Sequence, residues 1–267
     1  MIELLAGLFG LLIGSFLNVC IYRWPRDLSV VRPRSACPEC GKPIAAYDNI
    51  PVLSYLLLRG HCRNCDARIS WRYPVVEVLT AISFAFFVHT YGLDLAAAKY
   101  CVLAALLIGL AFSDLETLLL PDEMTVGGLV IGLAFSPFVP VPDSTFQLIS
   151  YLLGFRPGQR ADSLGEALAG ACFCSGLLWF AGWLFEKLRH KEGLGFGDVK
   201  LLAMAGAFLG VQGSITTMVI GSVIASVVGL LYIKLAGKDP ATYELPFGTF
   251  LAFAALLVAA AGPRLVF

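Results

Sequence analysis

Two aspartates stand at the ends of apolar segments, where a carboxylate is costly and therefore informative. Asp114 closes the apolar run in LIGLAFSDLETLLLPDEMT, and Asp198 lies between GLGFG and the apolar run LLAMAGAFLG. Charged groups at membrane depth are functional candidates by default. Two close carboxylates share one proton, so one acts as a base on water while the other polarises a scissile carbonyl and protonates the leaving amine. The pair predicts peptide hydrolysis that needs neither a metal nor a covalent nucleophile.

Each acidic side chain also has a simpler interpretation. Asp198 can be the N-cap of the helix that follows, because Asp is a favoured cap residue. Asp114 can be an interfacial residue where a helix leaves the membrane. Glu116, Asp122 and Glu123 are further carboxylates of the same segment, and we expect them to be solvated in a polar loop.

The residues around Asp198 add to the functional interpretation. Gly195 and Gly197 have no side chains, so their backbone can approach an extended peptide closely. We therefore expect this loop to hold an unwound substrate strand. Lys200 follows two residues after Asp198 and can either pair with it or bind a lipid phosphate.

Four cysteines form a second pattern with chemical meaning. CPEC supplies Cys37 and Cys40, and CRNC supplies Cys62 and Cys65. Two such pairs at this spacing are typical of a closed, structural zinc site with four thiolates. Two disulfides or redox-active pairs are the alternative, which a reducing cytosol disfavours. We expect the other four cysteines to be small buried hydrophobes: Cys20, Cys101, Cys172 and Cys174.

The elements that position these residues are membrane helices. Hydrophobic residues make up 58% of the 267 residues, charged residues only 14%, and the mean hydropathy is +0.80. Soluble domains carry about 25% charged residues, so the composition predicts an all-α polytopic membrane protein. The zero net charge gives no indication of a nucleic-acid partner. We expect about eight spans, at residues 2–21, 74–91, 96–113, 123–139, 166–185, 199–212, 214–233 and 248–262.

Lysine and arginine are distributed unevenly between the loops. With the N-terminus outside, fifteen lie in or beside cytosolic loops, and four lie on the other side: Lys99, Arg156, Arg160 and Arg264. Cytosolic loops carry the excess of positive charge, so this orientation places both aspartates at the cytosolic edge. We expect three parts: a first transmembrane helix over 1–22, a cytosolic zinc-binding segment over 23–73, and a membrane-embedded peptidase domain over 74–267.

Several segments in series resemble one family, the type IV prepilin leader peptidases, which are bifunctional aspartyl proteases of the bacterial inner membrane. The similar segments are GSFLNVCIYRWP (14–25), CPEC, YDNIPVLSYLLLRG, CRNC, ISWRYPVVEVLT (69–80), SDLETLLLPDEMT (113–125), GFGDVKLLAMAGAFLG (195–210) and ELPFGTFLA (244–252). They cover almost the whole chain in the order of the family.

The resemblance implies two reactions. The first is cleavage of prepilin or pseudopilin leaders after a glycine, on the cytosolic side, with Asp114 and Asp198 as the catalytic residues. The second is N-methylation of the new N-terminal residue with S-adenosylmethionine, and no glycine fingerprint in the sequence points to that cofactor independently. Glu77 can serve methyl transfer or simply pair with an arginine such as Arg72. Asn18 is another polar group within an apolar span.

Two other functions fit parts of the pattern. A membrane aspartyl peptidase without methyl transfer shares the paired aspartates, although the cysteine segment favours the bifunctional type. A small ion-coupled transporter also uses membrane aspartates, but it usually places them near the midplane of repeated halves. Here both aspartates lie at one edge, and no internal repeat is evident.

Overall fold

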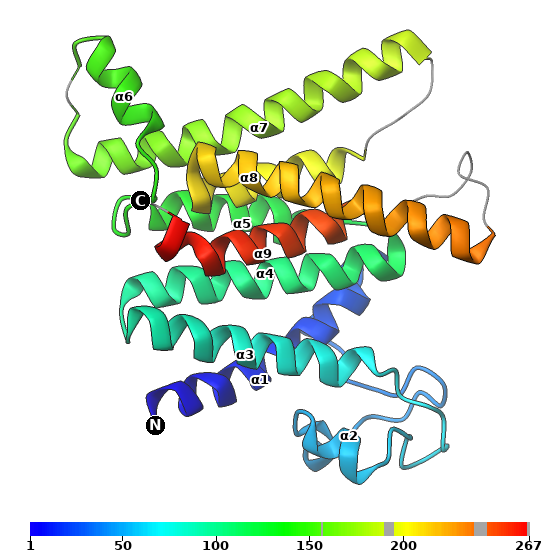
Figure 1. Cartoon of the computed structure of the whole chain (residues 1–267). Helices are drawn as coiled ribbons and strands as arrows, with labels where there is room; N and C mark the ends of the chain where they lie inside the picture. Colours follow the sequence, from blue (N-terminus) through cyan, green and yellow to red (C-terminus); the bar gives the residue numbers. More distant parts are fainter. Residues whose placement is uncertain (156, 190–194, 238–244, 266–267) are drawn as a thin grey trace. The chain divides into compact units, whose positions relative to one another are not determined.

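A computed structural model gives the fold for residues 1–155, 157–189, 195–237 and 245–265 (Figure 1). These residues form helices, loops and two isolated β-bridges. The expectations for Arg156, Lys191, Lys238, Glu244 and the Gly193–Leu194 part of the glycine loop lie outside the described residues. The chain divides into two compact units, Met1–Phe112 and Ser113–Phe267.

The first unit is organised around two helices that approach closely, α1 (Ile2–Arg23) and α3 (Arg72–Tyr91). A Cβ atom at Gly10 or Gly14 would lie only 2.7 Å from Ala81 Cα or 2.6 Å from Glu77 Cα. Small residues allow membrane helices to pack backbone to backbone in this way. The short elements η1 (Trp24–Arg26), η2 (Ala46–Asn49) and α2 (Leu53–Leu57) lie between them in the chain.

The helix α4 (Leu95–Thr117) runs from the first unit into the second. Near its start, Tyr100 stacks on Phe87 and Tyr91, with ring centroids 5.4 Å and 5.0 Å away. Its last residues carry Asp114 and so begin the unit that holds the candidate catalytic groups.

The described residues of the second unit form five further helices: α5 (Asp122–Phe135), α6 (Thr145–Leu152), α7 (Gln159–Arg189), α8 (Phe196–Ala236) and α9 (Phe247–Leu265). α8 packs against α5, α7 and α9. Gly170 and Gly206 let α7 and α8 touch through their backbones, because neither position has room for a Cβ atom. α8 is therefore the helix on which this unit is assembled.

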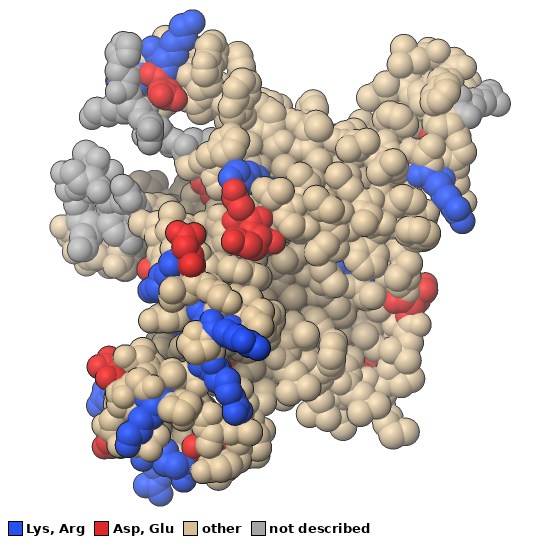
Figure 2. All heavy atoms as spheres, turned by 180° about the vertical axis from the view of Figure 1, so that it is seen from behind, with Lys and Arg blue, Asp and Glu red and all other residues tan. Residues whose placement is uncertain are grey.

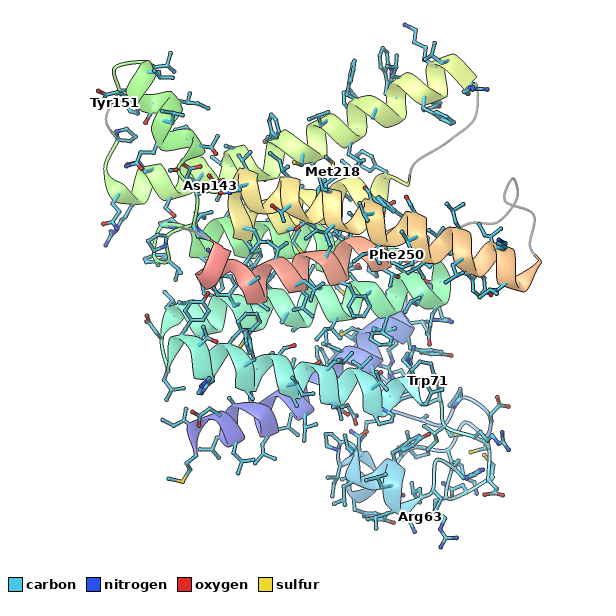
Figure 3. All side chains as sticks on the ribbon, viewed as in Figure 1. Arg63, Trp71, Asp143, Tyr151, Met218 and Phe250 are labelled. Atoms are coloured by element: carbon cyan, nitrogen blue, oxygen red, sulfur yellow. The ribbon has the colours of Figure 1, made fainter. Side chains whose placement is uncertain are left out.

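α8 is broken at Gly210, whose φ of 77° and ψ of −173° are not helical. Figure 1 shows the chain reversing at this break, so that the yellow and orange halves of α8 run antiparallel to each other. Asp143, labelled in Figure 3, accepts a hydrogen bond at 2.9 Å from the amide of Gln212 and so caps the second half. The break falls within the segment expected at 199–212, three residues before the expected boundary at residue 213.

Within the described residues, five helices are long and apolar enough to cross a membrane by length and composition: α1 extended by η1, α3, α4, α7 and α8. The apolar part of α9, Phe247–Gly262, is shorter, and α5 has only 14 residues. The fold is thus all-helical with several membrane-spanning candidates, and the expected count of eight is not established by these lengths. The three-part division at residues 22 and 73 stays a prediction.

Candidate active site and metal centre

Asp114 lies in the last turn of α4 and is held by the start of α9. Its side chain is buried, with 5% of its surface exposed. Its Oδ2 accepts hydrogen bonds from the Thr249 amide at 2.7 Å and the Thr249 hydroxyl at 2.9 Å. The first amides of a helix have no partner within the helix and attract negative charge. The N-terminus of α9 therefore fixes the orientation of the Asp114 carboxylate. An acidic residue that merely lay at the membrane interface would not require such hydrogen bonds.

Asp198 lies in the first turn of α8 and is also buried. Gly195 occupies the N-cap position, and the Asp198 amide donates to its carbonyl at 3.2 Å. The simpler interpretation of Asp198 as a helix cap is therefore wrong. No described residue donates a hydrogen bond to its carboxylate, so the structure does not explain this buried acid by a role in holding the fold.

Gly248 is the point at which the two carboxylates meet. A Cβ atom at this glycine would lie 3.0 Å from Asp198 Oδ1 and 3.2 Å from Asp114 Oδ2. The gap between these two oxygens cannot exceed the sum of the two distances, and their charges interact. Because residue 248 has no side chain, its backbone can lie close to both carboxylates, where any Cβ atom would be crowded.

The two glycines predicted to form a substrate loop have different surroundings. A Cβ atom at Gly195 would lie 3.5 Å from Asp198 Oδ2, so this glycine borders the carboxylate directly. A Cβ atom at Gly197 would lie 3.1 Å from Leu120 Cβ, so this glycine packs against the chain that follows α4. The geometry thus places Gly195 beside the candidate site, whereas Gly197 fits the helix start against Leu120. Their role toward a substrate stays a prediction.

Lys200 does not pair with Asp198. Its Nζ donates to both carboxylate oxygens of Asp122, at 2.6 Å and 2.8 Å, which joins the starts of α5 and α8. The side chains of Glu116, Asp122 and Glu123 are exposed, as expected for competitors that remain solvated. The Lys200 charge is therefore directed to the surface pair.

Gly248 and Thr249 were missed as site residues in the sequence. Both lie in ELPFGTFLA, which was singled out only as a segment similar to the family. A glycine followed by threonine at a helix start is a common pattern, because small and hydroxyl residues favour these positions. The only available signal was the segment itself, since contact with Asp114 bridges 135 positions of sequence.

The four cysteines of the CxxC pairs form one cluster. The Sγ atoms of Cys37, Cys40, Cys62 and Cys65 all lie within 4.8 Å of one another, and those of Cys37 and Cys65 are 3.8 Å apart. Thiolates around a tetrahedral zinc ion, with bonds of about 2.3 Å, stand about 3.8 Å apart. All four are free thiols, so the two-disulfide alternative finds no support. The donor set and its spacing fit a tetrahedral ion.

The backbone of each CxxC pair folds around the sulfurs in the same way. The Gly41 amide donates to the Cys37 carbonyl at 2.9 Å, and the Asp66 amide donates to the Cys62 carbonyl at 3.0 Å. The Asn64 amide also donates to Cys62 Sγ at 3.5 Å, and this bond is the main cause that lowers the pKa of the Cys62 thiol to about 7. A thiolate is the form that binds a metal.

One ion pair joins the loop between the pairs to the second pair. Arg63 donates to the two carboxylate oxygens of Asp48 at 2.9 Å and 2.7 Å, and this hydrogen bonding lowers the pKa of Asp48. Figure 3 labels Arg63 in this segment, and Figure 2 shows basic side chains gathered over it at the lower left. Of the cysteines outside the cluster, Cys20, Cys101 and Cys174 are buried as expected; the prediction is wrong for Cys172, which is exposed.

Glu77 is buried in the first unit, so it is not a solvated surface carboxylate. Its Oε2 accepts a hydrogen bond at 2.7 Å from the Val52 amide. Asn18, on α1, donates to the carbonyls of Tyr73 and Gly14 at 3.0 Å and 3.3 Å. Asn18 Oδ1 is buried and has no hydrogen-bond partner among the described residues. These groups form a polar cluster at the end of α1 and the start of α3.

Comparisons with known proteins agree over most of the chain. Residues 8–91 match the family described as the bacterial Peptidase A24 N-terminal domain, and residues 101–230 match the Type IV leader peptidase family. The latter range includes both aspartates.

Three curated proteins named prepilin leader peptidase/N-methyltransferase illustrate the similarity. The protein of Aeromonas hydrophila is 37% identical over 274 residues, which is 94% of this chain and 87% of that protein. The protein of Myxococcus xanthus is 40% identical over 232 residues, 86% of this chain and 62% of that protein. The protein of Pseudomonas aeruginosa is 34% identical over 270 residues, 92% and 86% of the two chains. No solved structure matches the chain significantly.

Proposed function

The chain belongs to the type IV leader peptidase family, and from this membership we propose that it is a prepilin peptidase with N-methyltransferase activity. It cleaves the basic leader of prepilins or pseudopilins after a glycine and then methylates the new N-terminal residue. Membership in a peptidase family argues against ion-coupled transport. The alternative that remains is a peptidase of the same family without methyl transfer.

The convergence of two buried carboxylates at Gly248 carries the proposed cleavage. Asp114 and Asp198 come from different helices, and a single position lies within 3.2 Å of an oxygen of each. A pair that shares one proton can deprotonate water and protonate the leaving amine at the same place. Thr249 holds Asp114 in orientation through two hydrogen bonds. The Gly195 backbone beside Asp198 leaves room for an extended substrate strand.

We propose that the peptidase site faces the cytosol at the inner membrane, in a chain with eight spans. The reversal of α8 at Gly210 supports this number, because its two halves are then separate spans and α5 and α9 are the short ones. Asp114 at the end of α4 and Asp198 at the start of α8 then lie at the same membrane edge. The excess of Lys and Arg in the adjoining loops supports the cytosolic side.

We also propose that the cysteine cluster binds one structural zinc ion. Cys37, Cys40, Cys62 and Cys65 would supply all four ligands, which leaves no open position for substrate. The segment has little core of its own, so metal binding supplies free energy for its folding. S-adenosylmethionine, when bound, supplies an electrophilic methyl group for the amine. Glu77, the residue that the resemblance linked to methyl transfer, is buried in the first unit.

The proposed cleavage is tested with the full-length protein in nanodiscs and a prepilin substrate. Asp114→Asn and Asp198→Asn are each expected to abolish cleavage while leaving membrane insertion and thermal unfolding unchanged. Glu123→Gln is the matched control, because this exposed carboxylate lies in the same segment. Mass spectrometry of the product N-terminus separates a methylated from an unmethylated product. Full cleavage by either Asn variant would refute the paired-aspartate mechanism.

A further inference from the structure

The first unit contains a groove that the peptidase mechanism does not use. Its volume is about 410 Å³, and it is bounded by α1 and by residues 30–35 and 44–51. Small-molecule sites usually have volumes of about 300–1,000 Å³. The groove lies within the range matched by the N-terminal family domain, whereas both aspartates lie in the range matched by the peptidase family. We propose that this groove binds the methyl donor, S-adenosylmethionine, an inference that rests on the methyltransferase half of the proposed function.

The chemistry of the groove suits an amphipathic, zwitterionic ligand. Leu12, Phe16 and Val19 form an apolar side, against which an adenine ring can lie. Ser15 and Arg34 are polar members of the lining. The aromatic and apolar side with few polar groups is the composition typical of ligand sites.

Two arginines of the groove have different tasks. Arg23 donates to the carbonyls of Ser29 and Pro33 at 2.8 Å each, so its charge is used to build the wall. The side chain of Arg34 makes no hydrogen bond or ion pair with other described residues, although it lines the groove. A guanidinium with its donors free binds a carboxylate in a bidentate manner. Arg34 is therefore the residue that binds the carboxylate of S-adenosylmethionine.

The wall formed by residues 49–51 is held by Glu77. Val52, the next residue, has a φ of 60° and a ψ of −49°, a conformation that β-branched residues rarely adopt. The Leu53 amide donates to the Pro51 carbonyl at 2.5 Å across this residue, which makes a tight γ-turn. Glu77 accepts the Val52 amide at 2.7 Å. Its backbone packs against α1, because a Cβ atom at Gly14 would lie only 2.6 Å from Glu77 Cα. Glu77 thus links the α1 side of the groove to the opposite wall.

Strained backbone persists only where its surroundings enforce it, and it concentrates at functional sites. Glu77 enforces the turn at Val52, and the turn presents Asn49 and Pro51 to the groove. Asn18, one turn from Ser15 on α1, keeps a buried amide oxygen without a partner among the described residues. Glu77 is therefore a positioning residue for the groove, which gives its burial a role beyond charge pairing.

The test measures binding of radiolabelled S-adenosylmethionine to the full-length protein in nanodiscs by equilibrium dialysis. Arg34→Ala removes a charged hydrogen-bonding partner and is expected to weaken binding about tenfold or more. Ala46→Trp fills the groove from a position that lines it, without removing any polar contact, and is expected to abolish binding. Arg32→Ala is the matched control, because Arg32 is exposed two residues away and does not line the groove.

Glu77 is tested by two substitutions with the same readout. Glu77→Gln keeps the size of the side chain and an acceptor for the Val52 amide, so binding is expected to fall less than with Glu77→Ala. Leader cleavage by all these variants is expected to stay within about twofold of the unaltered protein, because the aspartates lie in the other unit.

The outcomes separate this inference from the proposed function. Unchanged binding in both Arg34→Ala and Ala46→Trp overturns the groove as the donor site, while methylation of the product by the same protein leaves the proposed function intact. An unaltered protein that cleaves prepilin but neither binds the donor nor methylates the product refutes the methyltransferase half and the groove with it.

Discussion

Gly248 is the position at which the proposed active site is most sensitive to one added carbon atom. In Gly248→Ala, the new Cβ would lie 2.8 Å from Leu120 Cδ1, 3.0 Å from Asp198 Oδ1 and 3.2 Å from Asp114 Oδ2. All three are closer than ordinary van der Waals contact, so the neighbours must move by a few tenths of an ångström or more. The methyl group would therefore press on both carboxylates at once and change their separation and orientation.

The expected effect on catalysis is large, and the effect on folding is small. A misplacement on the order of 1 Å at a reacting centre costs about a hundredfold in rate, so we expect kcat to fall by about that factor. Overpacking costs about 1–3 kcal/mol, and replacing a helical glycine by alanine returns up to about 1 kcal/mol. The net loss of stability should therefore be about 2 kcal/mol or less, which leaves the protein folded.

The assay compares prepilin cleavage and thermal unfolding in nanodiscs. Gly262→Ala is the control in the same helix, because a Cβ atom there has no neighbour within 4 Å. It should leave both quantities unchanged. Cleavage by Gly248→Ala at the rate of the unaltered protein, with equal unfolding temperature, would show that the chemistry does not occur between the two carboxylates.

Three further perturbations separate the roles of neighbouring groups. Thr249→Val removes the hydroxyl that donates to Asp114 but keeps the backbone amide. We expect kcat to fall about tenfold, which is the value of one hydrogen bond to a charged group, and Thr249→Ser to restore it. An unchanged kcat in the valine variant contradicts the orienting role. Asp122→Asn weakens the ion pair with Lys200. The free energy of unfolding, measured with denaturant, should change by less than about 1 kcal/mol, because surface ion pairs contribute little. A larger loss means that the pair is structural. Cys37→Ser should release the metal and expose the 23–73 segment to limited proteolysis, and elemental analysis of the unaltered protein that finds no zinc refutes the metal site.

The acidic residues of the candidate site could be predicted because their position alone makes them exceptional. A carboxylate at the end of an apolar run is costly in any membrane fold, so Asp114 and Asp198 stand out without knowledge of their contacts. The simpler role of Asp198 as a cap could be excluded only with coordinates, which give the cap position to Gly195. The same holds for Lys200. From the sequence, an ion pair between Lys200 and Asp198 was possible, but in the structure Lys200 pairs with Asp122.

The helices could be predicted where length and hydropathy agree, and less well where one helix continues into another. The long apolar runs at α1, α3 and α4 gave clear boundaries. In α8 the chain reverses at Gly210, but glycines also occur at Gly206 and Gly213, and composition does not distinguish among them. Packing makes the distinction, since Asp143 caps the half-helix that starts after Gly210.

The sequence by itself determined the types of chemistry: paired carboxylates at the ends of membrane helices, and four thiolates at zinc spacing in a polar segment between helices. These follow from the costs of charge and the ligand preferences of metals, which depend on residue type and local spacing. Only the tertiary structure decided which groups complete the sites. Thr249 holds Asp114, the Gly248 backbone lies against both aspartates, and Glu77 holds the turn at Val52. Each of these contacts joins residues far apart in the chain, and closing such contacts depends on the packing of whole helices rather than on any local pattern.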